Sequence, residues 1–297
     1  MRTVRTVDGL RAALAPRRRE GAKIGLVPTM GALHDGHLSL IARARSECDV
    51  VVVSLFVNPA QFDERDDLQR YPRRERDDAQ LACDAGADVL FAPSVEEVYP
   101  PGFSTAVEVL GLGDRLEGAA RGPEHFRGVS TVVAKLLGMA MPDVAYFGQK
   151  DAQQTVVIRR LAADLNLPVR IQVCPTVREP DGLAMSSRNA RLSTQERSRA
   201  RALPEALRAA ARRAGEGERS TPALLDAARG AMLARGVEPE YLELVDPETF
   251  EPCDELQREA LLALAARIGR TRLIDNVVLR PSAAATPRQT SPRKAIA

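Results

Sequence analysis

Hydrophobic residues in the first part of the chain gather in short runs, and stretches with helical spacing lie between these runs. The apolar runs predict buried strands at 23–28, 50–57, 87–93, 143–148 and 168–175. Helical spacing predicts helices at 37–47, 75–86, 128–140 and 151–166. The segment STAVEVL (104–110) is also compatible with a strand. This order of elements is typical of an α/β fold, in which helices cover both faces of a parallel sheet.

The pattern changes after about residue 176. Ala- and Arg-rich stretches predict helices at 192–218, with a break at Pro204, and at 221–236. Strands are expected at 238–246 and 271–279, whereas 260–269 fits a helix by its propensity and a strand by its length.

The change in pattern predicts two domains and a tail. We expect a first domain at 1–176 and a smaller second α/β domain at 177–281. Residues 282–297 are small, polar and interrupted by proline, so we expect a disordered tail.

Composition limits the class of protein. Of the 297 residues, 44% are hydrophobic and 28% are charged, which is typical of a globular protein. No apolar run approaches the roughly 18 residues of a membrane span, and the N-terminal sequence lacks the apolar core of a signal peptide. We therefore expect a cytoplasmic protein without membrane association, with Cys48, Cys83, Cys174 and Cys253 as free thiols.

Charge argues against a dedicated nucleic-acid binder. The formal charge is +2, and part of it comes from the tail residues Arg288, Arg293 and Lys294. Aromatic residues make up only 4% and form no stacking series. The Arg-rich stretch 196–213 is the feature that a non-catalytic nucleotide- or RNA-binding module would use, but a solvated helix face explains it better.

The segment PTMGALHDGH (28–37) holds two of the three histidines, His34 and His37, separated by Asp35 and Gly36. It follows a predicted strand and leads into a helix, and open α/β sheets bind ligands at the carboxyl ends of their strands. A helix N-terminus favours anions, and Gly31 and Gly36 would let a ligand approach the backbone. Imidazoles can hydrogen-bond to phosphate oxygens. The segment predicts a site for a nucleoside triphosphate.

On the residues alone, two other interpretations of this segment stay open. His34 and His37 could be ordinary loop residues, because short motifs often occur by chance. They could also belong to a zinc site, although no Cys or further His lies nearby in the sequence as a third ligand.

Two further segments suit phosphate. GLAMSSRN (182–189) places Ser186, Ser187 and Arg188 after the turn EPDG, and hydroxyl and guanidinium groups bind polyphosphate well. Serine at a solvated helix start is the alternative. YFGQKDAQQ (146–154) runs from a strand end into a helix and supplies Lys150, although an ordinary loop with a solvated lysine would look the same. Together the segments predict one site built from three strand ends.

These segments resemble the signatures of a known family. HDGH resembles the HxGH signature of the nucleotidyltransferase superfamily, and MSSR resembles its KMSKS-like signature. PTMGALHDGH, FVNPAQF, FGQKDAQQ and PTVREPDGLAMSSRN together resemble the pantothenate synthetase (pantoate–β-alanine ligase) family, in order from about residue 3 to 280. The resemblance implies a Rossmann-like first domain and a smaller α/β lid domain.

The resemblance also implies the reaction. The family condenses (R)-pantoate with β-alanine through a pantoyl adenylate and converts ATP to AMP and pyrophosphate, in the biosynthesis of pantothenate and coenzyme A. Positively charged groups and hydrogen-bond donors would stabilise the charge that develops in the first step. Positioning of the reactants would supply much of the remaining catalysis.

Residue roles follow from the matched motifs. His37, His34 and Lys150 would be catalytic. Gln61 and Gln154 would bind pantoate, with Gln61 also near β-alanine and supported by Asn58. The implied ATP contacts are Met30, Gly31, Ala32, Leu33, His34, Asp35, Gly36, His37, Gly148, Gln149, Lys150, Asp151, the backbone at Val177, Met185, Ser186, Ser187 and Arg188.

The metal is a weaker implication of the resemblance. Mg²⁺ would accompany ATP, and no organic prosthetic group is implied. Asp77 and Asp78 match an acidic pair that is proposed to hold Mg²⁺ in some relatives, but Leu81 stands where a glutamine is expected. A solvated acidic helix face explains the pair equally well.

One other difference and one further block complete the comparison with the family. Gln149 stands where the family often has Glu, and we expect little effect from this difference. HFRGV (125–129) resembles a further family block, but no role is assigned to His125 or Arg127.

The family resemblance implies assembly and movement as well. Its members are typically homodimers through the first domain, and a hinge near 176–180 would let Ser186–Arg188 close over ATP. The nearest alternative function is another adenylyltransferase of the superfamily, which would use the same signatures without releasing free AMP.

Overall fold

The computed structural model describes residues 1–62 and 65–282, except for the side chains of 65–67 and 123. Residues 283–297 of the predicted disordered tail lie outside this part. The elements in chain order are β1 (Arg2–Val4), α1 (Val7–Arg19), β2 (Ile24–Thr29), α2 (Asp35–Glu47), β3 (Val50–Leu55), η1 (Pro59–Gln61), α3 (Arg65–Arg70), α4 (Glu75–Asp84), β4 (Val89–Phe91), α5 (Val95–Val98), α6 (Leu116–Arg121), α7 (Pro123–Ala140), β5 (Val144–Gly148), η2 (Gln149–Asp151), α8 (Ala152–Asp164), β6 (Arg170–Cys174), η3 (Ser187–Arg191), α9 (Thr194–Ala200), α10 (Ala202–Gly215), α11 (Thr221–Leu233), β7 (Pro239–Val245), β8 (Ala260–Ile268) and β9 (Thr271–Leu279).

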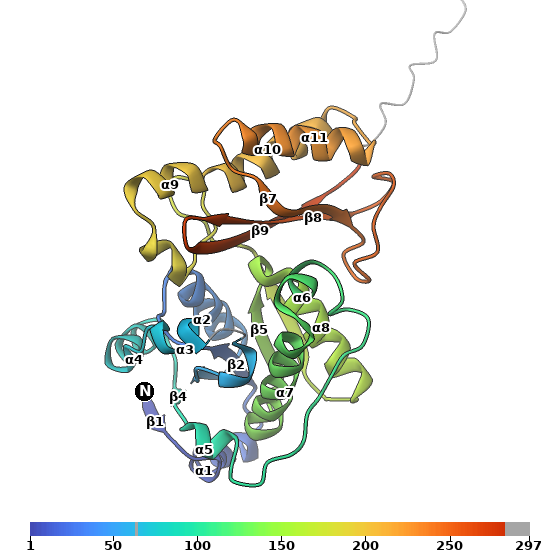
Figure 1. The fold of residues 1–297 in the computed structure, drawn as a ribbon. Coiled ribbons are helices and arrows are strands. Elements are labelled where there is room, and N and C mark those ends of the chain that lie inside the picture. Colours follow the sequence, from blue (N-terminus) through green and yellow to red (C-terminus); the bar gives the residue numbers. More distant parts are fainter. Residues whose placement is uncertain (63–64, 283–297) are drawn as a thin grey trace, which may run out of the picture.

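The first domain is built on a parallel sheet of six strands, in the order β1-β4-β3-β2-β5-β6. The order runs outward in one direction from β2 and in the other direction from β5 (Figure 1). The carboxyl ends of β2 and β5 therefore form the topological switch point, where open α/β sheets bind their ligands. The α/β fold expected from the sequence is confirmed.

Helices cover both faces of this sheet, and the continuous apolar runs follow from that. Val50 and Val52 of β3 belong to the core beneath α1, α7 and α8, whereas Val51 and Val53 belong to the core beneath α2 and α4. Because neighbouring strand residues point to opposite faces, a strand that is covered on both sides is apolar at every position.

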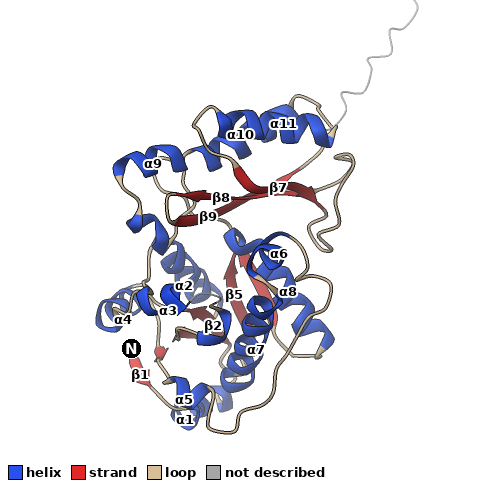
Figure 2. Ribbon diagram, viewed as in Figure 1, coloured by secondary structure: helices blue, strands red, loops and turns tan. Residues whose placement is uncertain are grey.

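The second domain has an antiparallel sheet in the order β7-β8-β9, with α10 and α11 on its outer face (Figure 2). Leu262 and Leu264 of β8 pack in the core under these helices, whereas Leu261 and Ala263 pack in the core of the first domain. This double burial makes 260–266 apolar at every position, which is why the pattern of 260–269 could not separate strand from helix. The structure settles that segment as a strand.

A mostly buried ion pair joins the two domains. Glu117 on α6 and Arg272 on β9 form two hydrogen bonds of 2.7 Å, and the Tyr241 hydroxyl donates to Glu117 at 2.9 Å. Burial raises the pKa of Glu117, but the hydrogen bonds and charge of Arg272 outweigh it, so its pKa lies below the ordinary value. The charged pair fixes the second sheet over α6.

The strand expected at 104–110 is not present in this described segment. The N–H of Val107 instead donates to Thr131 Oγ1 of α7 at 2.9 Å, so a side chain takes the place of a partner strand. The break expected at Pro204 lies at Arg201, and Pro204 is in the first turn of α10, where proline is tolerated. The pattern also missed β1, α1 and the short helices α3, α5 and α6.

Candidate active site

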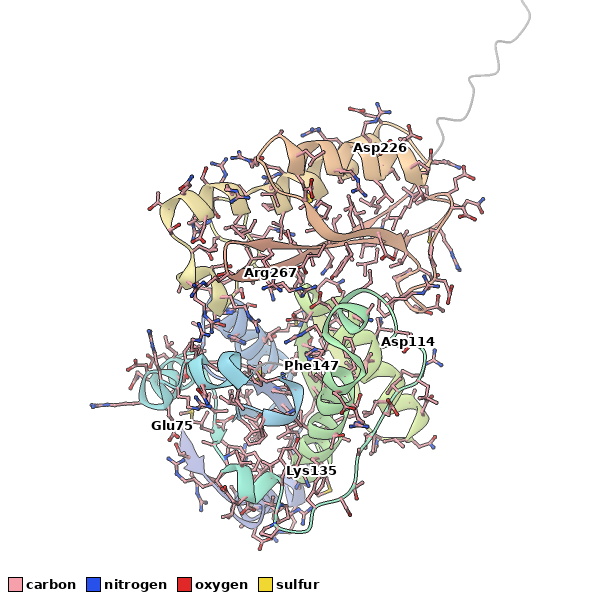
Figure 3. The ribbon with its side chains drawn as sticks, viewed as in Figure 1. Glu75, Asp114, Lys135, Phe147, Asp226 and Arg267 are labelled. Carbon is pink, nitrogen blue, oxygen red and sulfur yellow. The ribbon has the colours of Figure 1, made fainter. Side chains whose placement is uncertain are left out.

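A cavity of about 820 Å³ lies over the switch point, between the two domains. Figure 3 labels two residues of its wall, Phe147 at the end of β5 and Arg267 on β8. Many predicted ATP contacts line it: Met30, His34, Gly36, His37, Gly148, Lys150, Asp151, Val177, Met185, Ser186, Ser187 and Arg188. Gln61 and Gln154 line it too. Gly31, Ala32, Leu33, Asp35 and Gln149 are not part of its wall.

His34 and His37 lie against each other at the start of α2. Their ring centroids are 4.1 Å apart, and the backbone carbonyl of His34 accepts from the N–H of His37 at 2.7 Å. A Cβ on Gly36 would lie 2.9 Å from the His34 ring. The glycine between the histidines therefore makes room for an imidazole, and it also lies on the cavity wall, where a ligand would approach the backbone.

Burial holds both imidazoles in the neutral form. It lowers the pKa of His37 to about 3, with the neighbouring His34 as the next cause. Burial and then Lys150 lower the pKa of His34. The Nδ1 atoms of both rings are buried without a hydrogen-bond partner in the described residues. Buried polar atoms of this kind are rare and often belong to catalytic groups.

Asp78 holds the loop that precedes these histidines. Its carboxylate accepts from the N–H of Ala32 at 3.0 Å and of Leu33 at 2.7 Å. Ala32 has a φ of 50°, and Gly31 a φ of 87° with Leu55 and Asp78 packed where a Cβ would be. The carboxylate therefore stabilises a left-handed turn that few residues adopt.

This arrangement does not fit a metal site at Asp77 and Asp78. Asp78 is 2% exposed and both of its oxygens accept backbone N–H groups, while Asp77 is exposed and lies outside the cavity wall. Among the described residues, no cluster of three or more His, Cys, Asp or Glu side chains could hold a metal. The geometry gives Asp78 a structural role.

The loop after β5 is held from the other domain. Asn276 on β9 donates to the carbonyl oxygens of Gln149 at 3.1 Å and of Lys150 at 2.9 Å. The Gln149 side chain donates to Asn276 Oδ1 at 3.2 Å. Lys150 Nζ lies 3.3 Å from Asp151 Oδ1 and lines the cavity. The backbone beside Lys150 is therefore fixed by the second sheet.

The segment with the serines follows a hairpin whose turn is formed by EPDG. Gly182 N–H donates to the Glu179 carbonyl at 2.8 Å, and Met185 N–H donates to the Val177 carbonyl at 2.9 Å. Ser186 Oγ accepts from the N–H of Arg188 at 3.3 Å, so this serine does cap the short helix η3. The hairpin places Ser186–Arg188 at the cavity wall.

Arg178 connects this hairpin to the second sheet through an ion pair. Its guanidinium binds the buried Asp275 of β9 at 2.6 and 3.0 Å.

Gln61 is oriented by its neighbours. Asn58, which is 1% exposed, donates to Gln61 Oε1 at 3.0 Å and accepts from the Tyr99 hydroxyl at 2.8 Å. The support of Gln61 by Asn58 therefore takes the form of a hydrogen bond. A Cβ on Gly128 would lie 2.1 Å from the Ala60 carbonyl oxygen, so α7 packs directly on the backbone before Gln61.

The third histidine, His125, lies behind Gln61 and is 6% exposed. Its Nδ1 lies 2.9 Å from the Gln61 carbonyl oxygen, and its Nε2 lies 3.2 Å from Arg121 Nη1. Arg127 of the same block pairs with Glu124 on the surface. The two residues of HFRGV thus have different surroundings, and His125 is the one that contacts the cavity.

Comparisons with known proteins place this chain in a family. The family model described as pantoate-beta-alanine ligase matches residues 2–278. The chain belongs to the pantoate–β-alanine ligase family. The pantothenate synthetase of Cereibacter sphaeroides is 54% identical over 275 residues, covering 92% of this chain and 98% of the relative. Pantothenate synthetase 1 of Bradyrhizobium diazoefficiens is 54% identical over 280 residues, covering 94% and 98%.

Solved structures of the ligase family agree with the fold. The pantothenate synthetase of Thermus thermophilus superposes with a TM-score of 0.90 at 49% identity, covering 95% of this chain and all of that one. The ligase of Francisella tularensis, in complex with beta-gamma ATP and β-alanine, has a TM-score of 0.78 at 37% identity, covering 94% and 97%. ATP-dependent ligation is the function of this family.

Motifs of the ligase family did not point to every residue that shapes the site. Asn276 and Asp275 are adjacent in "TRLIDNVVL", where only a strand was expected, and no spacing links them to Lys150 or Arg178. The one available signal was the pair of polar residues between the apolar stretches 273–274 and 277–279, since a buried polar side chain needs a partner.

Proposed function

We propose that this chain condenses (R)-pantoate with β-alanine at the expense of MgATP, releasing pantothenate, AMP and pyrophosphate. First, a pantoate carboxylate oxygen bonds to the α-phosphorus and the bond to pyrophosphate breaks. Then the β-alanine amine attacks the acyl carbon of the adenylate, loses a proton and displaces AMP. The adenylate is needed because the oxygen of a free carboxylate is a poor leaving group. The family match and the F. tularensis complex support this reaction.

One part of the cavity suits the phosphates of ATP. Lys150 and Arg188 are cations on its wall, and Ser186 and Ser187 add hydroxyl groups. His34 and His37 are neutral, so each has one N–H to donate and no charge of its own. Such fixed donors and cations stabilise the charge that develops on the departing pyrophosphate.

Another part of the wall suits pantoate. Gln61 and Gln154 are uncharged amides, which donate and accept hydrogen bonds and so match both hydroxyls and a carboxylate. Asn58 holds the amide of Gln61, which reduces the entropy lost on binding. We assign pantoate to both glutamines and β-alanine to Gln61.

Magnesium is proposed as part of the substrate MgATP. Since Asp77 and Asp78 do not form a metal site, we assign no protein ligand to it. Mg²⁺ commonly binds through substrate phosphates and waters and neutralises phosphate charge.

A homodimer through the first domain and a cytoplasmic location also remain proposals. Family resemblance supports the dimer, and sedimentation of the purified chain tests it. Four free cysteines among the described residues agree with a reducing compartment. No helix in the described ranges is long and apolar enough to cross a membrane.

The observation that carries the proposal is the pair of neutral, partly unpaired imidazoles in one cavity with Lys150 and Ser186–Arg188. The test measures AMP and pyrophosphate with MgATP and pantoate, with and without β-alanine, in the wild type and in His37→Ala. We expect steady AMP release only with β-alanine, and its loss in the variant.

Other outcomes would contradict this function. Pyrophosphate release without AMP, in response to a different acceptor, would indicate another adenylyltransferase. An absence of turnover with every combination would leave the fold and remove the proposed reaction.

A further inference from the structure

The loop that carries Lys150 is a single turn between β5 and α8. It contains Gln149, Lys150 and Asp151, and Gly148 before it supplies no side-chain cap. A lysine is a flexible point charge, so its position depends on the backbone that carries it. A residue that fixes this backbone therefore also fixes the position of Lys150 in the proposed reaction.

Asn276 contacts this loop from the second domain. It is 5% exposed, and its amide nitrogen donates to two consecutive carbonyl oxygens, of Gln149 and Lys150. Carbonyl oxygens only accept, so the nitrogen must face the loop, and Oδ1 is left to accept from the Gln149 side chain. All three hydrogen bonds of this side chain join it to the loop.

The strand around Asn276 is itself fixed. Asn276 pairs with Ala263 of the central strand β8, and its own N–H donates to Asp275 Oδ1 at 2.8 Å. Asp275 binds Arg178, at the base of the hairpin that leads to Ser186. Two neighbouring residues of one strand thus contact two of the segments assigned to ATP.

We propose that Asn276 is a positioning residue for Lys150, so that the second domain sets the place of the ammonium group that faces the phosphates. This inference rests on the proposed function, because it assumes that Lys150 acts on ATP. Asn276 acts through the loop backbone and needs no contact with the substrate.

The test compares Asn276→Ala with Val277→Ala, in a pantoate-dependent ATP–pyrophosphate exchange assay that needs no β-alanine. Val277 is the next residue of β9 and packs on the core of the second domain, so it reports a general loss of packing. For Asn276→Ala we expect the exchange rate to fall by about 10- to 100-fold, with the KM for pantoate near that of the wild type. Val277→Ala should keep its exchange rate.

A double-mutant cycle separates positioning from a structural role. If Asn276 acts through Lys150, adding Asn276→Ala to Lys150→Ala should lower the rate by less than about threefold. Losses that multiply fully, or a normal rate in Asn276→Ala, would overturn the inference. Thermal melting tests whether each variant is folded. Asn276→Asp keeps the volume of the side chain but places an oxygen against the two carbonyl oxygens. It should therefore lose activity as Asn276→Ala does.

The two proposals fail differently. A wild type without pantoate-dependent exchange would overturn the proposed function and, with it, this inference. An active wild type with independent effects of Asn276 and Lys150 would overturn the inference alone.

Discussion

The loops after β2 and β5 meet at the same switch point, but different parts of the chain hold them. Asp78 of α4, within the first domain, binds the backbone of the β2 loop. Asn276 of β9, in the second domain, binds the backbone of the β5 loop. The histidine half of the site is therefore formed by the first domain itself, whereas the lysine half depends on how the second sheet is seated.

The largest expected effect on stability comes from a substitution that weakens the contact between the second sheet and the first domain. Arg272→Met removes one partner of the ion pair with Glu117 and leaves a mostly buried carboxylate without its charged hydrogen-bond partner. We expect a loss of about 3–5 kcal/mol in the free energy of unfolding, measured with urea. Hydrogen exchange should increase at 149–151 and change little at 31–34. Equal increases in both loops would contradict the comparison.

A substitution at Asp78 removes the corresponding support from the β2 loop. Asp78→Asn keeps the volume but replaces one acceptor by a donor that faces a backbone N–H. The expected loss is about 2–4 kcal/mol in the free energy of unfolding, with faster exchange at 31–34 and normal exchange at 149–151. Asp77→Asn, on the exposed side of α4, is the control and should leave stability unchanged. Were Asp78 a required metal ligand instead, the variant would keep its stability and lose its response to Mg²⁺.

A smaller effect is expected from a methyl group in the β2 loop. Gly36→Ala would place a Cβ 2.9 Å from the His34 ring and displace that imidazole. We expect kcat/KM to fall by about tenfold or more, since small misplacements at a reacting centre are costly, while the fold persists. Gly138→Ala, in the last turn of α7, where an added Cβ would meet no atom within 4 Å, is the control and should be as active as the wild type. Full activity in Gly36→Ala would show that the ring position is unimportant.

The smallest expected effect is a change of stability with pH, caused by protonation of His37 after the same loop. The folded pKa of His37 is about 3, against about 6.5 when unfolded, so between these values only the unfolded chain binds this proton. The free energy of unfolding must then fall as pH falls below about 6.5. Between pH 7 and 5.5 we expect the wild type to lose about 1 kcal/mol more than His37→Gln. Parallel stability curves for the two proteins would mean that His37 titrates normally.

The sequence predicted the parallel sheet well because burial on both faces leaves an unmistakable apolar run at 50–57. The same double burial made 260–269 ambiguous, since the pattern cannot separate a covered strand from a buried helix. The composition of residues 104–110 is compatible with a strand, but the side chain of Thr131 forms hydrogen bonds with the backbone of Val107. The local sequence pattern does not show which group will form hydrogen bonds with a given backbone segment.

The site was predictable to the extent that it lies in contiguous motifs. His34, His37, Lys150 and Ser186–Arg188 do line one cavity. The contact between Gly36 and the His34 ring was not foreseen, because a motif does not show where a nearby side chain turns. Asn276 was missed because it lies 126 residues from Lys150 in the sequence. Such long-range contacts are set by tertiary packing alone.

The position of His125 has a consequence for where protons can reside in the site. A guanidinium only donates hydrogen bonds, so Nε2 of His125 must accept from Arg121, and its single proton must lie on Nδ1 and point to the Gln61 carbonyl oxygen. The chain thus has one imidazole, that of His125, whose tautomer is fixed by structural hydrogen bonds. The tautomers of His34 and His37 are instead set when a reactant binds.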